Sequence, residues 1–401
     1  MQLPLPHSGQ MTILKQRKRF NVVACGRRFG KTYFGINEIA AQFALDGYPF
    51  GWFAPTYKYL LEPFEALRKL LLPVVSKANA TEMRIELVTG GVLDFWTLEN
   101  KDAGRGRKYK SVLVDEAGFA SNLGDAWQSA IRPTLTDMQG EAWFMGTPKG
   151  RNFFHTLFSW GKDPAFDDWA AWQMPTTANT SILGLAAEVA IAKASLPDRV
   201  FRQEYEAEFI EESGGVFTGV RECVGGLTEK TAPVAGRNYR LGWDIAKTQD
   251  FSVVVVVNDL GEQVYFDRFQ GVGWESQIQR VAGIAREYGA SSVVDSSGVG
   301  DPIYDRLVAE LPGLPVTGFK FTSSSKTQLI NNLALLIEQQ QVKLMDIPVQ
   351  TNELQAYEYK ITAGGNVTSS APDGMHDDCV MALALAVWSS KVRTWDWEAW
   401  N

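Results

Sequence analysis

The sequence predicts an α/β protein of two domains, the first of which is built around a mainly parallel sheet. The chain of 401 residues is longer than one ordinary domain, so two domains are the natural expectation. In the first half, short apolar strands alternate with segments of helical period, an order that gives a parallel sheet covered on both faces. The second half opens with three closely spaced strands before helices alternate again, which indicates a different α/β order.

The elements of the first half follow from apolar runs, which predict strands, and from apolar residues at helical spacing, which predict helices. Gly90-Gly91 interrupts the strand-like segment 84–98 and predicts a hairpin turn. The remaining elements are strands at 20–25, 51–54, 111–114 and 142–145, and helices at about 31–45 and 57–75.

Around residues 211–236 the periodic pattern fades into Gly, Thr, Glu and Pro, so we place a domain boundary there. We expect a first domain over residues 1–212, with a small linker subdomain from about residue 170, a linker over 213–236, and a second domain over 237–401. The second domain should contain strands at 239–246, 252–257, 263–269 and 291–295, and helices at about 275–288, 326–340 and 376–388.

Composition limits the classes of protein to which the chain can belong. Apolar residues make up 45% of it, enough for a core in each domain, but we find no apolar window that predicts a membrane span and no secretory signal. The three cysteines are far apart and predict free thiols in a reducing cytosol. The net charge of −7 argues against a protein that coats DNA, although basic residues gather at 15–19 and 105–110, as either a DNA contact or a solvated face.

The run Cys25-Gly26-Arg27-Arg28-Phe29-Gly30-Lys31-Thr32 lies between an apolar strand and an amphipathic helix, as a phosphate-binding loop requires. The backbone N–H groups of the loop and the start of the helix would hold the phosphates of ATP. Lys31 would neutralise phosphate oxygens, and Thr32 would bind Mg²⁺. Cys25 stands where the usual pattern has its first glycine.

A second motif supports nucleotide binding. Residues 112–114 form a buried strand that ends in Asp115 and Glu116, and a carboxylate pair at a strand end is costly unless it binds something. Asp115 suits the Mg²⁺ shell, and Glu116 suits the base that orients the attacking water. The alternative, a solvated helix start, explains one acidic residue better than two. The two motifs together predict hydrolysis of ATP.

Four further positions are candidates for the same site. Thr147, in Gly146-Thr147-Pro148, follows the next strand and would sense the terminal phosphate. Arg27 in the loop and Arg105 upstream of Asp115 could offer charge to the transition state. Gln10 could read an edge of the adenine base. The alternatives stay open, namely a surface arginine at position 105 and a structural role for Gln10.

The second half contains a set of separated carboxylates. Asp244 lies inside an apolar strand, Asp295 after Val293-Val294 repeats that arrangement, and His376-Asp377-Asp378 opens an apolar helix. Such buried acids repel one another unless cations hold them, and two Mg²⁺ or Mn²⁺ ions about 4 Å apart would do so. An all-oxygen ligand set favours these ions over zinc.

Each acid also has a structural alternative. Asp377 or Asp378 could cap the helix, and Asp295 could stabilise a turn. Of the two neighbours we favour Asp378 as the ligand, because it lies one turn before Met381 on a face that leads into the core, but Asp377 stays open. Asp250 is a further candidate with a structural role as its first interpretation. The order of acids and strands is that of a ribonuclease-H-like fold.

Taken in sequence, these motifs resemble the terminase large subunit of tailed bacteriophages. The loop with Arg27, the Asp115-Glu116 pair, the Gly146-Thr147-Pro148 run and the acids of the second half carry the resemblance, which covers nearly the whole chain. His376-Asp377-Asp378 is its most specific element. Further matching stretches are Arg132-Pro133 ahead of Gly140, Gln203-Glu204-Tyr205 and Gly298-Val299-Gly300.

The resemblance implies an N-terminal P-loop ATPase of the additional-strand, catalytic-glutamate type and a C-terminal RNase H-like nuclease. Glu116, Arg27 and Arg105 would serve ATP hydrolysis, with Arg105 offered across a subunit boundary. Asp244, Asp295 and Asp378 would hold the nuclease metals. The chain is short for this family after its last helix, so a tail that contacts the portal would be reduced or absent.

The resemblance also implies partners and a location. The protein would pump double-stranded DNA into a procapsid and cut concatemeric DNA when packaging starts and ends. Its partners would be a portal protein and a small terminase subunit, with a ring of five copies when docked and a monomer in isolation. It would work in the cytoplasm of the infected host and be absent from the mature virion. One alternative is an ATP-dependent nuclease of repair or restriction without capsid partners, and another is a non-catalytic scaffold.

Overall fold

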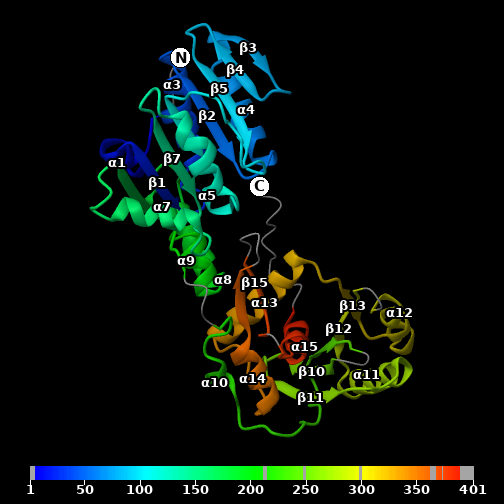
Figure 1. Ribbon diagram of the computed structural model, residues 1–401. Helices are drawn as coiled ribbons and strands as arrows, with labels where there is room; N and C mark the ends of the chain where they lie inside the picture. The colour runs from blue at the N-terminus through cyan, green and yellow to red at the C-terminus, as the bar shows by residue number, and fades with distance from the viewer. Residues whose placement is uncertain are drawn as a thin grey trace. The chain divides into compact units, whose positions relative to one another are not determined.

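The computed structural model describes residues 5–210, 215–246, 250–297, 300–361, 367–372 and 374–388. The described residues fall into two compact units (Figure 1). Residues up to 210 belong to unit 1, and residues 215–360 with those from 368 onward belong to unit 2. The expected boundary at 212–213 itself lies outside the described residues.

Unit 1 is built on a sheet in the order β3-β4-β5-β2-β6-β7-β1-β8. From β5 to β8 every neighbouring pair is parallel, and only the β3-β4-β5 flank is antiparallel. The strands are β1 (Phe20–Cys25), β2 (Pro49–Ala54), β3 (Val75–Asn79), β4 (Arg84–Leu87), β5 (Val92–Thr97), β6 (Ser111–Val114), β7 (Glu141–Gly146) and β8 (Trp169–Met174). The mainly parallel sheet predicted for the first domain is confirmed.

The position of β7 brings the two nucleotide motifs together. β7 lies between β1, which leads into the phosphate loop, and β6, which leads into Asp115. All three strands are parallel, so their carboxyl ends meet at one edge of the sheet, where ligands of such sheets bind. The one strand inserted between the two motifs is the arrangement expected of an additional-strand ATPase.

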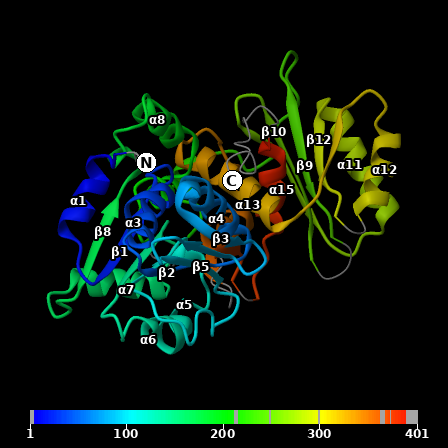
Figure 2. The same ribbon diagram turned by 90° about the horizontal axis from the view of Figure 1, so that it is seen from above.

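Each face of this sheet carries its own core because alternate residues of a strand point to opposite faces. One face packs Trp52, Trp143 and Met145 beneath α1 (Ser8–Gln16), α3 (Ala41–Leu45) and α4 (Lys58–Leu70). The other face packs Val114 and Phe144 beneath α5 (Leu123–Ala126), η4 (Trp127–Ile131) and α7 (Phe153–Lys162). Figure 2 shows α1, α3 and α4 on one side of the sheet and α5, α6 (Arg132–Thr134) and α7 on the other.

Unit 1 differs from the prediction in several places, and its helices α1, α5, α6 and α7 were not predicted. The helix expected over 31–45 is α2 (Lys31–Phe34), a π-helical segment η1 (Gly35–Ala40) and α3 in succession. The helix expected to reach residue 75 ends at Leu70, and after the short turn η2 (Leu72–Val74) the chain forms strand β3. Strand β8 and the short helix η3 (Ala117–Phe119) were not predicted, because neither has a distinct periodic pattern.

A small group of helices follows β8 in unit 1. It consists of η5 (Thr176–Ala178), α8 (Leu185–Ser195) and α9 (Asp198–Glu204), and α8 and α9 share a small core of their own. The linker subdomain was expected from about residue 170, but β8 pairs in parallel with β1 over Trp169–Met174 and so belongs to the main sheet. The helical group therefore begins after Met174.

Unit 2 is built on a sheet in the order β11-β10-β9-β12-β13. Its strands are β9 (Tyr239–Asp244), β10 (Ser252–Asn258), β11 (Gln263–Phe269), β12 (Ser291–Asp295) and β13 (Val316–Phe319). The first three strands form an antiparallel meander, and β12 and β13 add in parallel on the other side of β9. This order, with the first strand in the middle, is the RNase H-like arrangement that was predicted.

Helices cover both faces of the second sheet. α11 (Trp274–Tyr288) and α12 (Gly300–Glu310) pack on one face, and α13 (Ser323–Glu338), α14 (Pro348–Ala356) and α15 (Asp378–Val387) pack on the other. Gly242 permits the close approach of α15 to β9, since a Cβ at this position would lie 2.1 Å from the carbonyl oxygen of Ala382. α14 leads into a two-stranded hairpin of β14 (Glu358–Ile361) and β15 (Val367–Ser370).

The segment 213–236, expected to be a linker, packs in part against unit 2. Val216, Phe217, Val220 and Cys223 are buried in the core beneath α13 and α14, and the last two belong to the short helix α10 (Val220–Cys223). The sequence did not reveal this because the apolar residues are few and separated by Gly, Thr and Glu. Among the described helices none is long and apolar enough to cross a membrane.

Candidate active sites

The phosphate loop of unit 1 has two residues in the left-handed region of backbone space. Gly30 has φ +91° and Arg28 has φ +62°. Glycine adopts this conformation freely, whereas a residue with a side chain carries strain there that the surrounding structure must hold. Alternation of right- and left-handed residues turns successive N–H groups towards one point, which is how such loops bind anions.

Not every N–H group predicted to hold phosphate is available for it. The N–H of Gly26 donates to the carbonyl of Met174 at 2.9 Å, and that of Arg27 donates to the carbonyl of Glu204 at 2.7 Å. Gly26 is also enclosed, because a Cβ there would lie 2.5 Å from the carbonyl oxygen of Tyr205. These two N–H groups therefore donate to backbone carbonyls and not to phosphate. The helix that starts at Lys31 offers the N–H groups of its first turn.

Cys25 replaces a glycine of the usual loop pattern at no cost to the loop itself. Its side chain is buried in the core beneath α3 and α4, with Sγ 3.8 Å from the carbonyl oxygen of Gly146. Burial raises the pKa of the Cys25 thiol to about 12, so the group stays protonated and apolar in character. Cys25, Cys223 and Cys379 are all free thiols, as predicted.

Lys31 and Thr32 meet the acidic pair at the end of β6. The Lys31 Nζ lies 2.9 Å from Glu116 Oε1, and the Thr32 hydroxyl donates to Asp115 Oδ2 at 3.2 Å. Burial alone would lower the pKa of Lys31, but the opposite charge of Glu116 raises it above its ordinary value. The two motifs that the sequence placed more than eighty residues apart thus form one site.

The surroundings of Asp115 and Glu116 disfavour two ionised carboxylates at this position. Burial and the neighbouring charge of Glu116 raise the pKa of Asp115 to about 7. Glu116 has φ +50°, and its Oε2 is buried without a hydrogen-bond partner among the described residues. A buried carboxylate oxygen of this kind is costly unless a ligand satisfies it. The donor set of Thr32, Asp115 and Glu116 therefore fits a hydrated Mg²⁺ and an attacking water.

Thr147 lies at the end of β7, between the two strands that carry the motifs. It is buried, and its carbonyl oxygen would lie 2.3 Å from a Cβ placed on Gly118. Asn152 donates to the carbonyl of Gly118 at 2.8 Å and caps α7 by accepting from the N–H groups of Phe154 and His155. The segment after β7 is therefore packed closely against the segment that follows Glu116.

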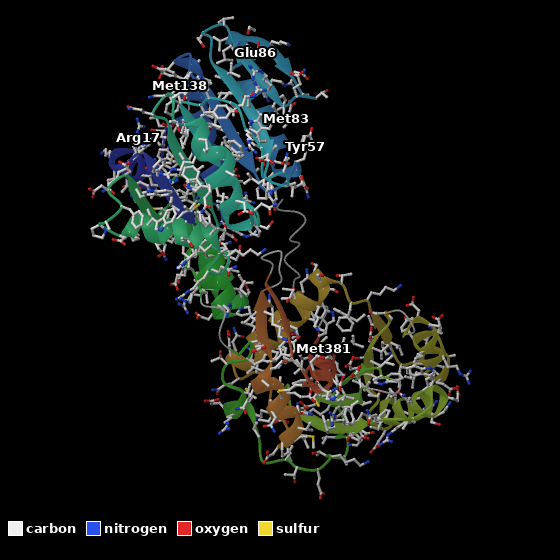
Figure 3. All side chains as sticks on the ribbon, viewed as in Figure 1. Arg17, Tyr57, Met83, Glu86, Met138 and Met381 are labelled. Atoms are coloured by element: carbon white, nitrogen blue, oxygen red, sulfur yellow. The ribbon has the colours of Figure 1, made fainter. Side chains whose placement is uncertain are left out.

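The two candidate arginines lie in different surroundings. Arg27 is paired with Glu204 of α9, with Nε and Oε2 2.6 Å apart. Arg105 pairs with Asp102 of its own loop at 2.8 Å, and 69% of its side chain is exposed. The structure thus places Arg105 on the surface, as both open interpretations require. The basic run at 15–19 is likewise exposed, and Arg17 projects from unit 1 in Figure 3.

Gln10 is close to the phosphate loop, but the oxygen and the nitrogen of its side-chain amide both form hydrogen bonds with the protein backbone. Its Nε2 donates to the carbonyl of Gly30 at 3.1 Å, and its Oε1 accepts from the N–H of His7 at 3.2 Å. The side chain is buried. Contact with adenine stays a prediction, whereas the structural role that the sequence left open is present.

In unit 2 the carboxylates predicted from the sequence converge. Asp244 ends β9 and Asp295 ends the adjacent parallel strand β12, so both lie at the same edge of the sheet. Burial raises the pKa of Asp244 well above its ordinary value, and the charges of Asp378, Asp295 and Asp377 raise it further. Asp295, Asp377 and Asp378, which follow Asp244 by more than fifty residues in the sequence, thus act on it in the folded protein.

Asp378 also has two partners, of which the sequence named Asp250 as a further candidate and His376 only as the start of the HDD run. Ligand atoms of Asp250, His376 and Asp378 all lie within 4.8 Å of one another, with His376 Nδ1 3.5 Å from Asp250 Oδ1 and 3.6 Å from Asp378 Oδ2. This geometry makes Asp250 and His376 candidate ligands beside Asp378, whereas the structural role of Asp250 and the all-oxygen ligand set stay predictions. Asp250 lies six residues after a strand-end acid, and His376 begins the HDD run, but neither position alone predicts a ligand.

The structure distinguishes the two adjacent aspartates. Asp378 has a side chain that is only 9% exposed, and it accepts from the N–H of Phe251 at 3.2 Å. Asp377 is 31% exposed and pairs with Lys326 of α13 at 3.2 Å. Met381, the residue used to favour Asp378, is buried inside unit 2 (Figure 3). Asp378 therefore lies with the candidate ligands Asp250 and His376, whereas Asp377 pairs with Lys326 at the margin of the site.

Buried polar groups beneath α15 support Asp378. Glu353 of α14 accepts from the N–H of Cys379 at 2.8 Å, and its carboxylate lies 3.6 Å from Arg268 Nη2. The Arg268 guanidinium lies over the ring of Phe251, 3.4 Å from its centroid. The start of α15 is therefore held from below by a buried ion pair.

Asp295 has a second role as well. Its Oδ1 accepts from the N–H of Ser297 at 2.8 Å, the turn chemistry that the sequence left open as an alternative. The Ser297 hydroxyl in turn accepts from the N–H of Phe321, just before α13. Of the Gly298-Val299-Gly300 stretch noted in the sequence, Gly298 and Val299 lie outside the described residues.

Comparisons with known proteins agree with this arrangement. A family model described as a terminase RNaseH-like domain matches residues 241–389. The terminase large subunits of Thermus virus P23-45 and Thermus phage G20c are each 30% identical to the chain, over an alignment that covers 95% of the chain and 87% of each relative. The solved large terminase of another thermophilic bacteriophage is 12% identical and superposes with a TM-score of 0.55 over 95% of this chain and 98% of that one, a likeness of fold.

Proposed function

The chain belongs to the family of terminase large subunits and joins an ATPase unit to an RNase H-like nuclease unit, and from this premise we propose that it packages a double-stranded viral genome. Unit 1 hydrolyses ATP to move the DNA into a procapsid, and unit 2 cuts concatemeric DNA when packaging starts and ends. The observation that carries the proposal is that one chain holds both a Lys31–Glu116 and Thr32–Asp115 nucleotide site and the convergent acids of unit 2.

In unit 1 the residues divide the work of ATP hydrolysis. Lys31 leaves Glu116 for the phosphate oxygens when Mg²⁺-ATP binds, because the phosphates bring more negative charge than one carboxylate. Glu116 is then free to accept a proton from the attacking water. Thr32 and Asp115 hold the Mg²⁺, whose charge neutralises the phosphates. Arg27 lies in the loop itself and stabilises the charge of the transition state.

In unit 2 the acids hold divalent cations. Asp250 with His376 and Asp378 would provide one position, since their ligand atoms lie within 4.8 Å of one another, and Asp244 with Asp295, at the ends of the adjacent strands β9 and β12, would provide a second. Two Mg²⁺ or Mn²⁺ ions supply an activated water and a clamp on the attacking and leaving oxygens of the scissile phosphodiester. Asp377 and Lys326 restrain the margin of the site. The buried Glu353–Arg268 pair keeps Asp378 in place.

The partners follow from the packaging role. The protein acts on double-stranded DNA with a portal protein at the procapsid and with a small terminase subunit. Docked copies form a ring of five in which the exposed Arg105 reaches the nucleotide of a neighbour, and isolated copies are monomers. The protein works in the cytoplasm of the infected bacterium and does not remain in the mature virion.

The test uses one preparation of the full chain and a procapsid that carries its portal. DNA-stimulated ATP hydrolysis, Mn²⁺-dependent plasmid cleavage and ATP-dependent protection of DNA from added nuclease should all be present. Mixing Arg105→Ala subunits with Lys31→Ala subunits should restore part of the ATPase activity if the arginine acts across the boundary. Hydrolysis and cleavage without any protection of DNA would instead favour an enzyme of repair or restriction.

A further inference from the structure

The four successive carbonyl groups of the phosphate loop are each bonded by a side chain from outside the loop. The carbonyl of Arg27 accepts from Thr176 Oγ1 at 2.6 Å, and that of Arg28 accepts from Asn179 Nδ2 at 2.8 Å. The carbonyl of Phe29 lies 2.8 Å from His7 Nε2, which must donate because a carbonyl only accepts. The carbonyl of Gly30 accepts from Gln10 Nε2 at 3.1 Å.

The orientation of both amides is determined by their other ends. Asn179 Oδ1 accepts from the N–H of Ser181 at 3.0 Å, so its nitrogen must face the carbonyl of Arg28. Gln10 Oε1 accepts from the N–H of His7, so its nitrogen must face the carbonyl of Gly30. Gln10, Thr176 and Asn179 are buried, where an unmade hydrogen bond is costly.

The four side chains come from two segments that also contact each other. His7 and Gln10 lie at the start of α1, and Thr176 and Asn179 lie at η5 just after β8. The Ser8 hydroxyl is 3.3 Å from the Thr180 hydroxyl, and a Cβ on Gly9 would lie 3.1 Å from the carbonyl oxygen of Ala178. The two segments therefore enclose the loop on the side where its carbonyls point.

Holding these carbonyls has a direct effect on the N–H groups of the same loop. Each carbonyl and the N–H that follows it belong to one planar peptide and point in opposite directions. Fixing the carbonyl of Phe29 away from the nucleotide therefore turns the N–H of Gly30 to the opposite side, while the N–H of Phe29 donates to the carbonyl of Gly26 within the loop at 3.3 Å. Arg28 needs this restraint most, because its φ of +62° is strained for a residue with a side chain.

We propose that His7, Gln10, Thr176 and Asn179 form a carbonyl clamp whose function is to hold the phosphate loop in its anion-binding shape before the nucleotide arrives. The four are positioning residues for triphosphate, and Gln10 contributes to affinity through the loop and not through the adenine base. The inference rests on the proposed ATP binding by unit 1.

The experiment measures the affinity of the full chain for Mg²⁺-ATP and for Mg²⁺-tripolyphosphate, a probe without a base, by calorimetry. Asn179→Asp and Gln10→Glu keep the oxygen that accepts a backbone N–H and replace the donor nitrogen by a second acceptor. Gln173→Glu is the matched control, since Gln173 of β8 donates to the carbonyl of Glu206 and touches no part of the loop. Thr176→Val removes the hydroxyl but keeps the shape of the side chain, whereas Thr176→Ser keeps the hydroxyl. Comparison of these two variants therefore tests the hydroxyl itself.

Asn179→Asp, Gln10→Glu and Thr176→Val should each weaken the binding of both probes by about ten- to 100-fold, because each loses a buried hydrogen bond. The KM for ATP should rise more than kcat falls, and Mn²⁺-dependent cleavage by unit 2 should match wild type. Gln173→Glu and Thr176→Ser should bind both probes as wild type does. If Asn179→Asp does not fold, the Thr176 pair carries the test.

Two results would overturn the inference while leaving ATP hydrolysis by unit 1 in place. Either Asn179→Asp and Thr176→Val bind both probes as Gln173→Glu does, or Gln10→Glu loses ATP but keeps tripolyphosphate, which is the behaviour of an adenine reader. A wild-type chain that fails to bind Mg²⁺-ATP would instead remove the proposed function on which the clamp depends.

Discussion

Both units gather buried carboxylates at the carboxyl ends of parallel strands, but they balance the charge differently. In unit 1 the pair Asp115 and Glu116 has Lys31 in direct contact, with Nζ 2.9 Å from Glu116 Oε1. In unit 2 the acids around Asp244 outnumber the cations beside them, and Lys326 pairs with Asp377 at the margin. One site contains its own counter-ion, and the other depends on cations from solution.

This difference matches the two kinds of chemistry. A lysine that can move from a carboxylate to a phosphate lets the ATPase site stay assembled between rounds of nucleotide binding. A permanent lysine among the nuclease acids would compete with the metals that activate water. The comparison therefore predicts that ligands affect the stability of the two units unequally.

The largest effect is expected for Asp244→Asn. Loss of this ligand should lower metal-dependent cleavage by about 1000-fold or more, since metals stabilise the transition state by several kcal/mol. The ATPase rate should stay at the wild-type value, because Asp244 belongs to unit 2. Plasmid nicking with Mn²⁺ and phosphate release from ATP, measured on the same protein, check this.

The same variant also tests the charge imbalance. Without metal, Asp244→Asn should melt at a higher temperature than wild type, because it removes a buried carboxylate that three other acids repel. Metal should then stabilise wild type more than the variant. A metal-free variant that melts lower than wild type would contradict the imbalance.

The next largest effect is expected for Glu116→Gln. Removing the base for the attacking water should lower ATP hydrolysis by about 100- to 10,000-fold while leaving Mn²⁺-dependent nicking intact. Lys31→Ala should also abolish hydrolysis, and it should destabilise nucleotide-free unit 1 more than Glu116→Gln does, since it leaves Glu116 buried without its counter-ion. Loss of nicking in either variant, with normal folding, would break the two-site division.

A moderate effect is expected from pH in unit 1. The pKa of Asp115 is raised from its ordinary 3.8 to about 7, so between these values folded protein holds a proton that unfolded protein has released. The free energy of unfolding should therefore fall as pH rises through this window and level off above about 7. Affinity for Mg²⁺-ATP should rise through the same window, because Mg²⁺ needs the ionised carboxylate.

Urea unfolding between pH 4.5 and 8 checks this dependence, with Asp115→Asn as the control. The variant should lose the part of the slope that lies between the two pKa values. A wild-type chain and variant with parallel pH profiles would show that Asp115 is not the titrating group.

The smallest effect is expected for Lys326→Met. Lys326 lowers the pKa of Asp244, so its loss should raise that pKa further and shift the pH dependence of cleavage upward. The ion pair with Asp377 is about one-third exposed on both sides, so its contribution to stability is small, roughly 0–1 kcal/mol. Lys326→Arg, which keeps the charge, should restore the wild-type pH profile. Matching profiles of Lys326→Met and wild type would remove Lys326 from the electrostatics of the site.

The sequence by itself determined the fold class, the two motifs of the nucleotide site and the acids of the nuclease site. Apolar runs that end in a glycine-rich loop or in Asp115 and Asp244 leave few alternatives, because a carboxylate at the end of a buried strand needs a ligand. The predicted strands at 20–25, 111–114 and 291–295 agree with β1, β6 and β12 for this reason, and the predicted strand at 263–269 agrees with β11. For these strands the local pattern of apolar residues was sufficient to predict the structure.

Only the tertiary structure decided which side chains meet. Asp250 and His376 join Asp378 through the approach of α15 to β9, which depends on Gly242 and has no signal along the chain. The side chains of Thr176 and Asn179 reach loop carbonyls about 150 residues earlier because β8 pairs with β1. Local periodicity specifies which face of an element is buried, whereas partners across that face are set by how sheets and helices pack.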